Sequence, residues 1–368
     1  MSVNDTLYPL KLEPLLRERI WGGSRMSDVL PAARGKNLSG IGEAWIVYDQ
    51  LTVANGPLAG KRLAELARQY TARLLGESVE AQQHGVFPLL VKFLDAKDWL
   101  SIQVHPDNHY AQIVENQPFG KCEMWYVASA GPGAQIVHGL NRAMSAAELG
   151  AAIADGTLTD KIRLIDVQAG DVILNLPGTI HALGQGVLIY EVQQSSDLTY
   201  RVFDWGRVQP DGTPRELHVD KALDVTKRSP LQNHTIRPVV IKQDEAVTHM
   251  ILCACDYFAV EKLDIRTSIR GSSGKGSFRV LTAIEGTGAL GCDVCDPVEI
   301  ETGETILIPS SVAEYTLEPA GAALTLLQSY VPDLARDIVQ PLQAIGTPPD
   351  VIRQLGGDPG DSHLARYL

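Results

Sequence analysis

The sequence has few cysteines and no long apolar run. Its 368 residues include five cysteines, an odd and sparse count that favours reduced thiols in a cytoplasm over a disulfide framework. Nowhere do about 18 apolar residues follow one another, which excludes a membrane-spanning helix. The N-terminal stretch is broken by Pro9 and Pro14 and lacks the apolar core of a signal peptide. We therefore predict a cytoplasmic protein.

The chain also has fewer basic than acidic side chains. The chain has 44 acidic against 32 basic side chains and a formal net charge of −12. Such a protein repels nucleic-acid phosphates and anionic lipid on average, so we expect neither a nucleic-acid nor a membrane partner. Hydrophobic residues make up 45% of the chain, enough to bury a core in each of about two domains.

The pattern of apolar residues predicts a mainly β protein. Glycine (33) and proline (21) punctuate short segments rich in Val, Ile, Leu and Tyr, which is typical of strands in a sandwich or barrel. These segments are residues 88–94, 123–128, 171–176, 186–192 and 305–309. Helical spacing at residues 61–83, and a capping box of Ser145 and Glu148 opening residues 145–153, predict short helical insertions.

An internal similarity divides the chain. QAGDVILNLPGTIHAL, from Gln168, resembles ETGETILIPSSVAEYTL, from Glu301, but the second copy has Glu314 near the place of His181 and no histidine. We predict two similar barrels, residues 1–235 with the functional groups and residues 236–368 without metal ligands. Residues 207–241 would connect them, and residues 280–290 would form an earlier strand pair of the second unit. Chance reuse of a Gly-turn-strand pattern is the alternative.

The densest group of chemical side chains begins in LSIQVHPDNHYA, from Leu100. Alternate residues of a strand share a face, so Ser101, Gln103 and His105 point the same way. Glu123 opens the next apolar strand, and His181 follows the Pro177-Gly178 turn. Two imidazoles, a carboxylate and an amide oxygen suit a divalent metal with an open position, zinc first. The alternative is that these are ordinary turn and rim residues.

Cationic side chains accompany this group. Lys121 precedes Glu123 by two residues, and EVQQSSDLTYRVFDWGR, from Glu191, adds Arg201 and Arg207. Arginine offers a fixed fork for phosphate, whereas a lysine such as Lys92 offers a point charge. The pattern is compatible with capture of a small anion and proton transfer beside a metal, and equally with a salt-bridge network along a strand edge, which is the more common arrangement of such residues.

Four of the five cysteines form two short motifs, a C-x-x-C at Cys292 and Cys295 and a C-x-C at Cys253 and Cys255. A structural zinc ribbon would need two knuckles of similar geometry, so we favour reduced thiols.

Seven motifs, in this order along the chain, resemble the short bacterial form of the type I phosphomannose isomerases, within the cupin superfamily. They are RIWGG at Arg19, GEAW at Gly42, LVKFL at Leu90, SIQVHPD at Ser101, GKCEMWY at Gly120, PGTIHAL at Pro177 and SSDLTYRVFDWGR at Ser195. The resemblance implies two cupin-type jelly-roll barrels with short helical insertions and one Zn²⁺ per chain. It also implies an aldose-ketose isomerase that interconverts mannose 6-phosphate and fructose 6-phosphate, small hexose phosphates, through an enediol.

The resemblance also implies roles for individual residues. The metal ligands would be Gln103, His105, Glu123 and His181; the catalytic residues Arg201, Lys121 and Glu191; and the phosphate-side residues Ser101, Lys92 and Arg207. Arg207 stands where longer members carry lysine, and Ile20 stands where they place an acid before the early Trp-Gly.

The residues leave three points open. Lys121 and Glu191 are both candidates for the general base. Two histidines and a carboxylate also suit Fe(II), so another metal cupin enzyme, such as an Fe(II) oxygenase, is the first rival function. A non-catalytic cupin that binds sugar phosphates is the second, because a fold alone does not establish an activity.

Overall fold

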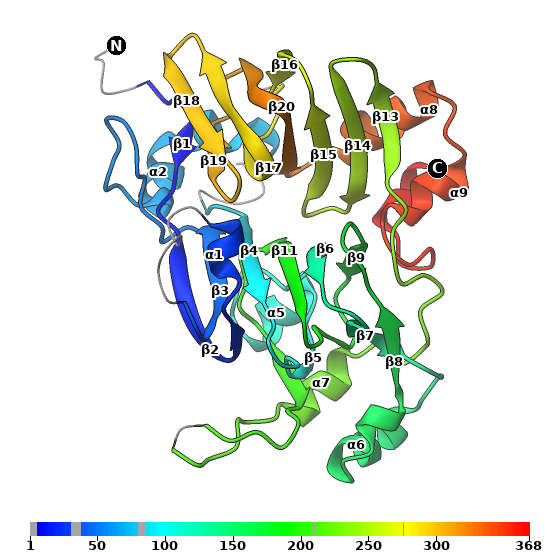
Figure 1. The fold of residues 1–368 in the computed structure, drawn as a ribbon. Coiled ribbons are helices and arrows are strands. Elements are labelled where there is room, and N and C mark those ends of the chain that lie inside the picture. Colours follow the sequence, from blue (N-terminus) through cyan, green and yellow to red (C-terminus); the bar gives the residue numbers. More distant parts are fainter. Residues whose placement is uncertain (1–5, 31–37, 80–85, 210, 275) are drawn as a thin grey trace.

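The computed structural model describes residues 1–368 except 1–5, 31–37, 80–85, 210 and 275 (Figure 1). It is built mainly from antiparallel strands in three sheets, with short helices between them, which confirms the predicted mainly β class. Among the described residues no helix is long and apolar enough to cross a membrane.

The first unit consists of two facing sheets. The six-stranded sheet runs, in order, β2 (Leu15–Gly23), β3 (Ile41–Val47), β4 (Leu89–Asp95), β11 (Val187–Gln194), β6 (Glu123–Ala130) and β9 (Val172–Asn175). The five-stranded sheet runs β12 (Tyr200–Phe203), β5 (Ile102–Val104), β10 (His181–Ala182), β7 (Gln135–Leu140) and β8 (Ile162–Asp166). One apolar cluster, which includes Trp125 and Ile189 of the first sheet and Ile136 of the second, joins them.

Apart from its edge strand β2, the six-stranded sheet is largely buried on both faces. Along β11, Leu188, Tyr190 and Val192 belong to the core shared with the second unit. Ile189 and Glu191 alternate with them and face the interior of the first unit, because successive side chains of a strand point to opposite faces. This explains why the strand reads as a nearly continuous apolar run that contains one acidic residue.

The second unit is a nine-stranded sheet that lies above the first unit in Figure 1. Its main path is β1 (Leu10–Lys11), β19 (Thr305–Ile308), β17 (Arg279–Cys292), β20 (Glu314–Tyr330), β15 (Ala259–Ile265), β14 (Val247–Ala254) and β13 (Val239–Gln243). β16 (Ile269–Ser272) pairs with β20, and β18 (Cys295–Glu301) pairs with β17. The C-terminal helical segments are η4 (Leu334–Val339), α8 (Gln340–Ala344), α9 (Pro349–Gln354) and η5 (His363–Tyr367).

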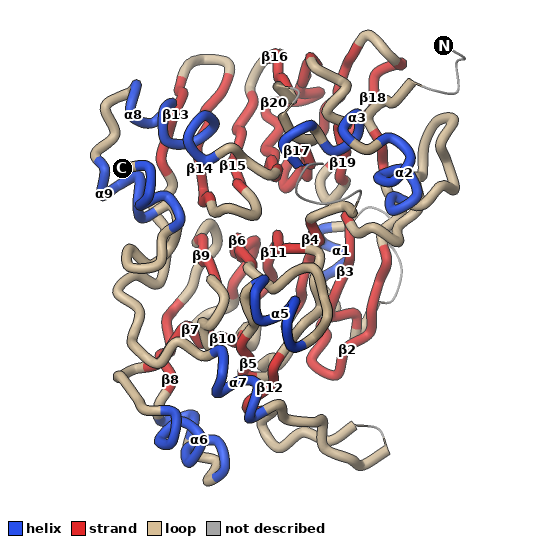
Figure 2. The backbone as a smooth tube through the Cα atoms, turned by 180° about the vertical axis from the view of Figure 1, so that it is seen from behind, coloured by secondary structure: helices blue, strands red, loops and turns tan. Residues whose placement is uncertain are grey.

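The helices that precede residue 236 in the sequence are short. They are α1 (Met26–Val29), α2 (Leu63–Tyr70), α3 (Ala72–Leu75), α5 (Asn108–Val114), α6 (Ala146–Ala154), η3 (Leu158–Asp160) and α7 (Val219–Val225). Two of them, α2 and α3, lie beside the second unit (Figure 2). Figure 2 shows α7 next to β12 and β5, with α6 at the end farthest from the second unit. The Ser145–Glu148 capping box of α6 is confirmed. The helical stretch expected at residues 61–83 is interrupted, since Thr71 has φ 39° and ends α2. Its residues 80–83 lie outside the described part.

The internal similarity corresponds to equivalent turns in the two units. Gly170 and Gly303 both have positive φ values, 94° and 90°, which favour glycine. The Gly170 amide donates to Val127 of β6, and the Gly303 amide donates to Ala283 of β17. The strand pair expected at residues 280–290 is instead one long bulged strand, β17.

The two units share a large core. The cluster around Phe87, Phe93 and Tyr190 of the first unit continues into Phe258 and Phe278 of the second. The N-terminal strand β1 precedes the first unit in sequence but pairs with β19 of the second. The division at residues 1–235 and 236–368 stays a prediction.

We expect Phe278→Ala to destabilise the whole chain. The Phe278 ring is fully buried and lies 4.6 Å, centroid to centroid, from that of Phe87. Removing a buried phenyl ring costs about 3–5 kcal/mol of unfolding free energy. Urea unfolding measures the loss. Ile113→Ala, at a side chain that is 68% exposed, is the control and should change it by less than about 0.5 kcal/mol. Equal effects of the two changes would contradict the shared core.

Candidate active site

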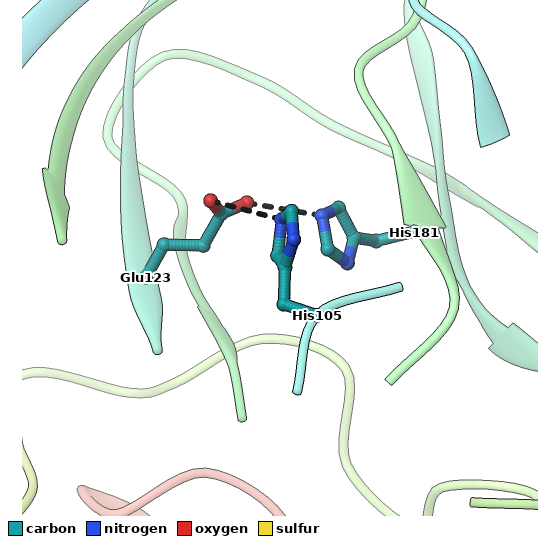
Figure 3. A group of neighbouring side chains, drawn as sticks. All are labelled: His105, Glu123 and His181. Carbon is teal, nitrogen blue, oxygen red and sulfur yellow. Dashed lines mark ion pairs between the residues drawn. The ribbon is translucent and has the colours of Figure 1, made fainter. Parts of the chain in front are cut away.

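Three side chains from different strands converge in the interior of the first unit (Figure 3). His105 directly follows β5, Glu123 opens β6 and His181 opens β10. The Nε2 atom of His181 lies 3.1 Å from Glu123 Oε1, and that of His105 lies 3.4 Å from Glu123 Oε2. All three side chains are about 1% exposed. The sequence prediction that these residues meet agrees with the geometry.

Backbone carbonyls fix which ring nitrogens are free. His105 Nδ1 lies 2.8 Å from the Leu198 carbonyl, and His181 Nδ1 lies 2.9 Å from the Thr179 carbonyl. A carbonyl only accepts, so each Nδ1 carries the proton in the neutral ring and each Nε2 presents a lone pair. Both lone pairs therefore face the Glu123 carboxylate. The two Nε2 atoms and the Glu123 carboxylate thus face one another as electron-pair donors, and none of the three donates a hydrogen to another. Such a group fits a cation at its centre.

A glycine turn sets the position of both histidines. The Gly178 amide donates to the His105 carbonyl at 2.9 Å, and Gly178 has φ 87°. A Cβ at this position would lie 2.8 Å from the Val225 carbonyl oxygen, so only glycine fits without a shift. The Pro177-Gly178 turn therefore ties the end of β5 to the start of β10.

The charge state of the group also suits a metal. Burial, and then the nearby Lys121 ammonium, lower the pKa of His105 to about 3, so the ring is neutral at pH 7. Burial alone would raise the pKa of Glu123, but Lys121 and the two histidines hold it well below its ordinary value. His105 Nε2 has no hydrogen-bond partner. In the described part of the chain this is the one group of three or more His, Cys, Asp or Glu side chains placed to hold a metal ion.

Gln103 lies beside this group. It is opposite His181 in the register of β5 and β10, and its Nε2 atom lies 3.5 Å from His181 Nε2. The two ends of an amide are assigned from their contacts, and rotation of the amide would bring its oxygen to the same place. Gln103 as a fourth ligand stays a prediction.

Two lysines and a second acid line the same interior face. Lys121 Nζ lies 2.9 Å from Glu123 Oε2, and Lys92 Nζ lies 3.0 Å from Glu191 Oε2. The Trp125 indole donates to the other oxygen of Glu191 at 2.9 Å. Burial, opposed by Lys92 and reinforced by Glu123, raises the pKa of Glu191. Burial alone would lower the pKa of Lys121, but Glu123 and Glu191 raise it.

The sequence reasoning missed three buried polar residues of this face. Glu43 accepts from Arg19 Nε at 2.7 Å and from the Trp45 indole at 2.6 Å. Burial alone would raise its pKa, but Lys92 and Arg19 lower it to about 2. Asn175 and Gln193 are the strand partners of Glu123 on either side, and their side-chain oxygens have no hydrogen-bond partner. The only signal in the sequence was a polar residue inside an apolar strand.

The remaining candidates lie around β5 and β12. Arg201 is the register partner of Gln103, and its Nη1 donates to the Glu216 carbonyl at 2.8 Å. Arg207 is held by Asp204 and by the Trp99 carbonyl. Ser101 is buried just before β5. The structure thus brings the expected metal ligands together on one interior face with Lys121, Lys92 and Glu191. Arg201 lies on the neighbouring strand β12, and Arg207 lies in the turn that follows it.

The cysteines do not form a zinc ribbon. Cys255 lies next to Cys122, with 3.9 Å between their Sγ atoms, and Cys253 is buried. Cys292 and Cys295 face each other across the β17–β18 hairpin, 3.5 Å apart. Reduced thiols agree with this arrangement.

A β barrel that buries two imidazoles and a carboxylate around one point, beside ammonium and guanidinium groups, defines a metal-dependent cupin enzyme. Residues 9–125 match the family model of "Phosphomannose isomerase type I, catalytic domain", and residues 248–330 match that of "Mannose-6-phosphate isomerase, cupin domain". The chain is 35% identical over 322 residues to mannose-6-phosphate isomerase ManA of Bacillus subtilis, which covers 85% of this chain and 96% of that protein. It belongs to the type I phosphomannose isomerase family.

Solved structures agree with the cupin architecture. The crystal structure of the mannose 6-phosphate isomerase from Bacillus subtilis has a TM-score of 0.78 and 32% identity, over 88% of this chain and 99% of that one. A zinc-bound mannose 6-phosphate isomerase has a TM-score of 0.71 over 88% of this chain and 100% of that one; at 17% identity it shows the fold alone. The predicted cupin fold is confirmed.

We expect His181→Ala to abolish tight zinc binding. The substitution removes one of two imidazole donors and leaves Glu123 and His105 with an incomplete set. Elemental analysis after dialysis should find about one zinc per wild-type chain and little in the variant. His109→Ala, at an exposed residue of α5, is the matched control and should keep the metal. A variant that still holds zinc at wild-type stoichiometry would remove His181 from the ligand set.

Proposed function

We propose that this chain interconverts mannose 6-phosphate and fructose 6-phosphate as a zinc-dependent aldose-ketose isomerase. Family membership over most of the chain supports the reaction, and the convergence of His105, Glu123 and His181 is the observation that carries the metal. The substrate is thus a small hexose phosphate. A cytoplasmic location stays a prediction.

His105, Glu123 and His181 would hold the ion, with Gln103 as the fourth candidate. When bound, Zn²⁺ supplies a Lewis acid that stabilises negative charge on a sugar oxygen. The protein contributes the fixed orientation of the donors, because both imidazoles are locked by backbone carbonyls. The sheet register holds Gln103 beside them.

The reaction moves one proton between C2 and C1, and the chain offers two groups for it. Glu191 and Lys121 lie on the interior face beside the metal ligands, and both are buried. Burial strengthens a proton-transfer group by excluding competing water. Arg201, on the strand adjacent to Gln103, would stabilise charge on the enediol oxygens. Lys92 holds the Glu191 carboxylate in position through their 3.0 Å ion pair.

The phosphate would be held by Arg207, Ser101 and Lys92, of which Lys92 is also paired with the Glu191 carboxylate. Ser101 precedes β5 and Arg207 follows β12, and these strands are neighbours in the five-stranded sheet. Because the two strands are antiparallel, both residues lie at the same end of this strand pair. Fixing the phosphate orients the reacting carbons toward the metal ligands.

We expect a strong chelator to abolish the interconversion and added zinc to restore it. Nuclear magnetic resonance can follow exchange of the C2 and C1 protons of the two sugar phosphates in deuterated water. The proposal is supported if proton exchange stops when the chelator removes the metal and returns when zinc is added. Oxygen consumption by the iron-loaded chain, without sugar-phosphate exchange, would favour an oxygenase. Binding of sugar phosphate by the zinc-loaded chain without exchange would favour a non-catalytic protein.

We expect substitution of the base to lower kcat about 10²–10⁴-fold, the usual contribution of general base catalysis. Glu191→Gln and Lys121→Met are the two variants, and both keep the size of the side chain. The variant that lacks the general base should retain zinc and bind the sugar phosphate but lose exchange of the carbon-bound proton. If both variants exchange that proton at the wild-type rate, neither residue is the base.

A further inference from the structure

Three arginines crowd around one buried aspartate beside the candidate site. Arg215 Nε donates to Asp204 Oδ2 at 2.7 Å, and Arg207 Nη2 donates to Asp204 Oδ1 at 2.5 Å. Arg215 also donates through Nη2 to Oδ1, so its contact with Asp204 is bidentate. Burial, and then the charges of Arg215 and Arg207, lower the pKa of Arg201.

This cluster has an excess of positive charge. Arg207 and Arg215 bind the Asp204 carboxylate, and Arg201 interacts electrostatically with Asp204 and with Glu216. The Glu216 side chain is 83% exposed, so water screens its charge. The chain as a whole carries −12, so the local excess is opposite to the average. Like charges in a partly buried cluster repel each other. A bound anion would relieve that repulsion.

An unusual turn builds the cluster. Trp205 and Gly206 have φ values of 57° and 68°, and the Arg207 amide donates to the Asp204 carbonyl at 3.0 Å. This is a type I′ turn, which normally has Gly, Asn or Asp at its first central position rather than tryptophan. The Trp205 indole donates to the Leu100 carbonyl at 2.7 Å and packs on Trp99. These contacts hold a backbone conformation that costs free energy, as is common at ligand sites.

The turn leaves guanidinium hydrogens available. A guanidinium has five N–H donors. In the described part of the chain, Arg215 uses Nε and Nη2 on Asp204, and no acceptor lies against its Nη1. Arg201 uses Nη1 on the Glu216 carbonyl, and its buried Nε has no partner. The side chains of Arg207 and Arg215 are 15% and 21% exposed, so a small solute can reach them.

We propose that Arg215 binds the phosphate of the substrate together with Arg207, and that Asp204 is the positioning residue that holds both guanidinium groups for it. This rests on the proposed function for the identity of the ligand, a hexose phosphate. Arginine suits the role because its planar fork matches phosphate oxygens. Arg201 is the register partner of Gln103 and interacts electrostatically with Arg215 and Arg207, so one guanidinium group would link the phosphate to the reacting end of the sugar.

The test compares wild type with Arg215→Gln, which keeps the side chain as far as Cδ, stays polar and removes the guanidinium charge. Glucitol 6-phosphate has no carbonyl group and cannot isomerise, so titration calorimetry with the zinc-loaded chain measures its binding alone. Arg215→Gln should weaken this binding about tenfold or more and leave binding of phosphate-free glucitol unchanged. KM for mannose 6-phosphate should rise in parallel with little change in kcat. Arg142→Ala, which breaks an exposed ion pair with Glu148, is the control and should change neither.

Two further variants separate positioning from folding. Asp204→Asn should also weaken glucitol 6-phosphate binding, with zinc content unchanged. Arg215→Lys keeps the positive charge but loses the planar guanidinium fork, so it should bind glucitol 6-phosphate with intermediate affinity. If Arg215→Gln does not fold, the affinity of Arg215→Lys tests the role of Arg215 instead. Wild-type affinity in every folded variant would overturn the proposal. Wild-type chain that binds glucitol 6-phosphate through Arg215 but fails to isomerise mannose 6-phosphate would overturn only the proposed function.

Discussion

The structure of the site depends on one electrostatic constraint, the Glu123 carboxylate facing two imidazole lone pairs. The carbonyls of Leu198 and Thr179 each hold an Nδ1–H, so neither ring can turn a hydrogen toward the acid without losing a buried hydrogen bond. A cation satisfies all three donors together. The constraint is set by backbone atoms, which makes it insensitive to side-chain changes elsewhere in the barrel.

That constraint holds because the six-stranded sheet is fixed on both faces. Its outer face packs on the second unit through residues such as Phe93 and Tyr190, and its inner face carries Glu123, Lys92 and Glu191. The Tyr190 hydroxyl lies 3.3 Å from Thr282 and from Ser329 of the second unit, so even this outer face has polar contacts. The second unit thus acts as a platform that keeps the strands of the first in register, even though it holds none of the expected metal ligands.

Much of this could be predicted from the sequence because the ligands follow strong local signals. His105 ends an alternating strand, Glu123 opens an apolar one, and His181 follows a Pro-Gly turn. Other features have no local signal. β1 pairs with β19 through Leu10 and Leu307, and nothing near Leu10 in the sequence indicates so distant a partner. Glu43, Asn175 and Arg215 were missed because a polar residue in a strand or loop looks the same whether it faces water or a buried site.

The charges of the interior face explain why a divalent metal and a phosphorylated sugar go together. Among the described residues, three carboxylates of this face are each paired with one cation. The pairs are Glu43 with Arg19, Glu191 with Lys92 and Glu123 with Lys121. These six groups therefore balance one another before any ligand binds, and the excess of positive charge around Arg201, Arg207 and Arg215 is additional to them. A Zn²⁺ ion would add two positive charges to this face, and a hexose phosphate carries about two negative charges at pH 7. Burying either one alone would be costly, whereas the charges of the two offset each other. The barrel is thus suited to a dianionic sugar when it holds a divalent ion.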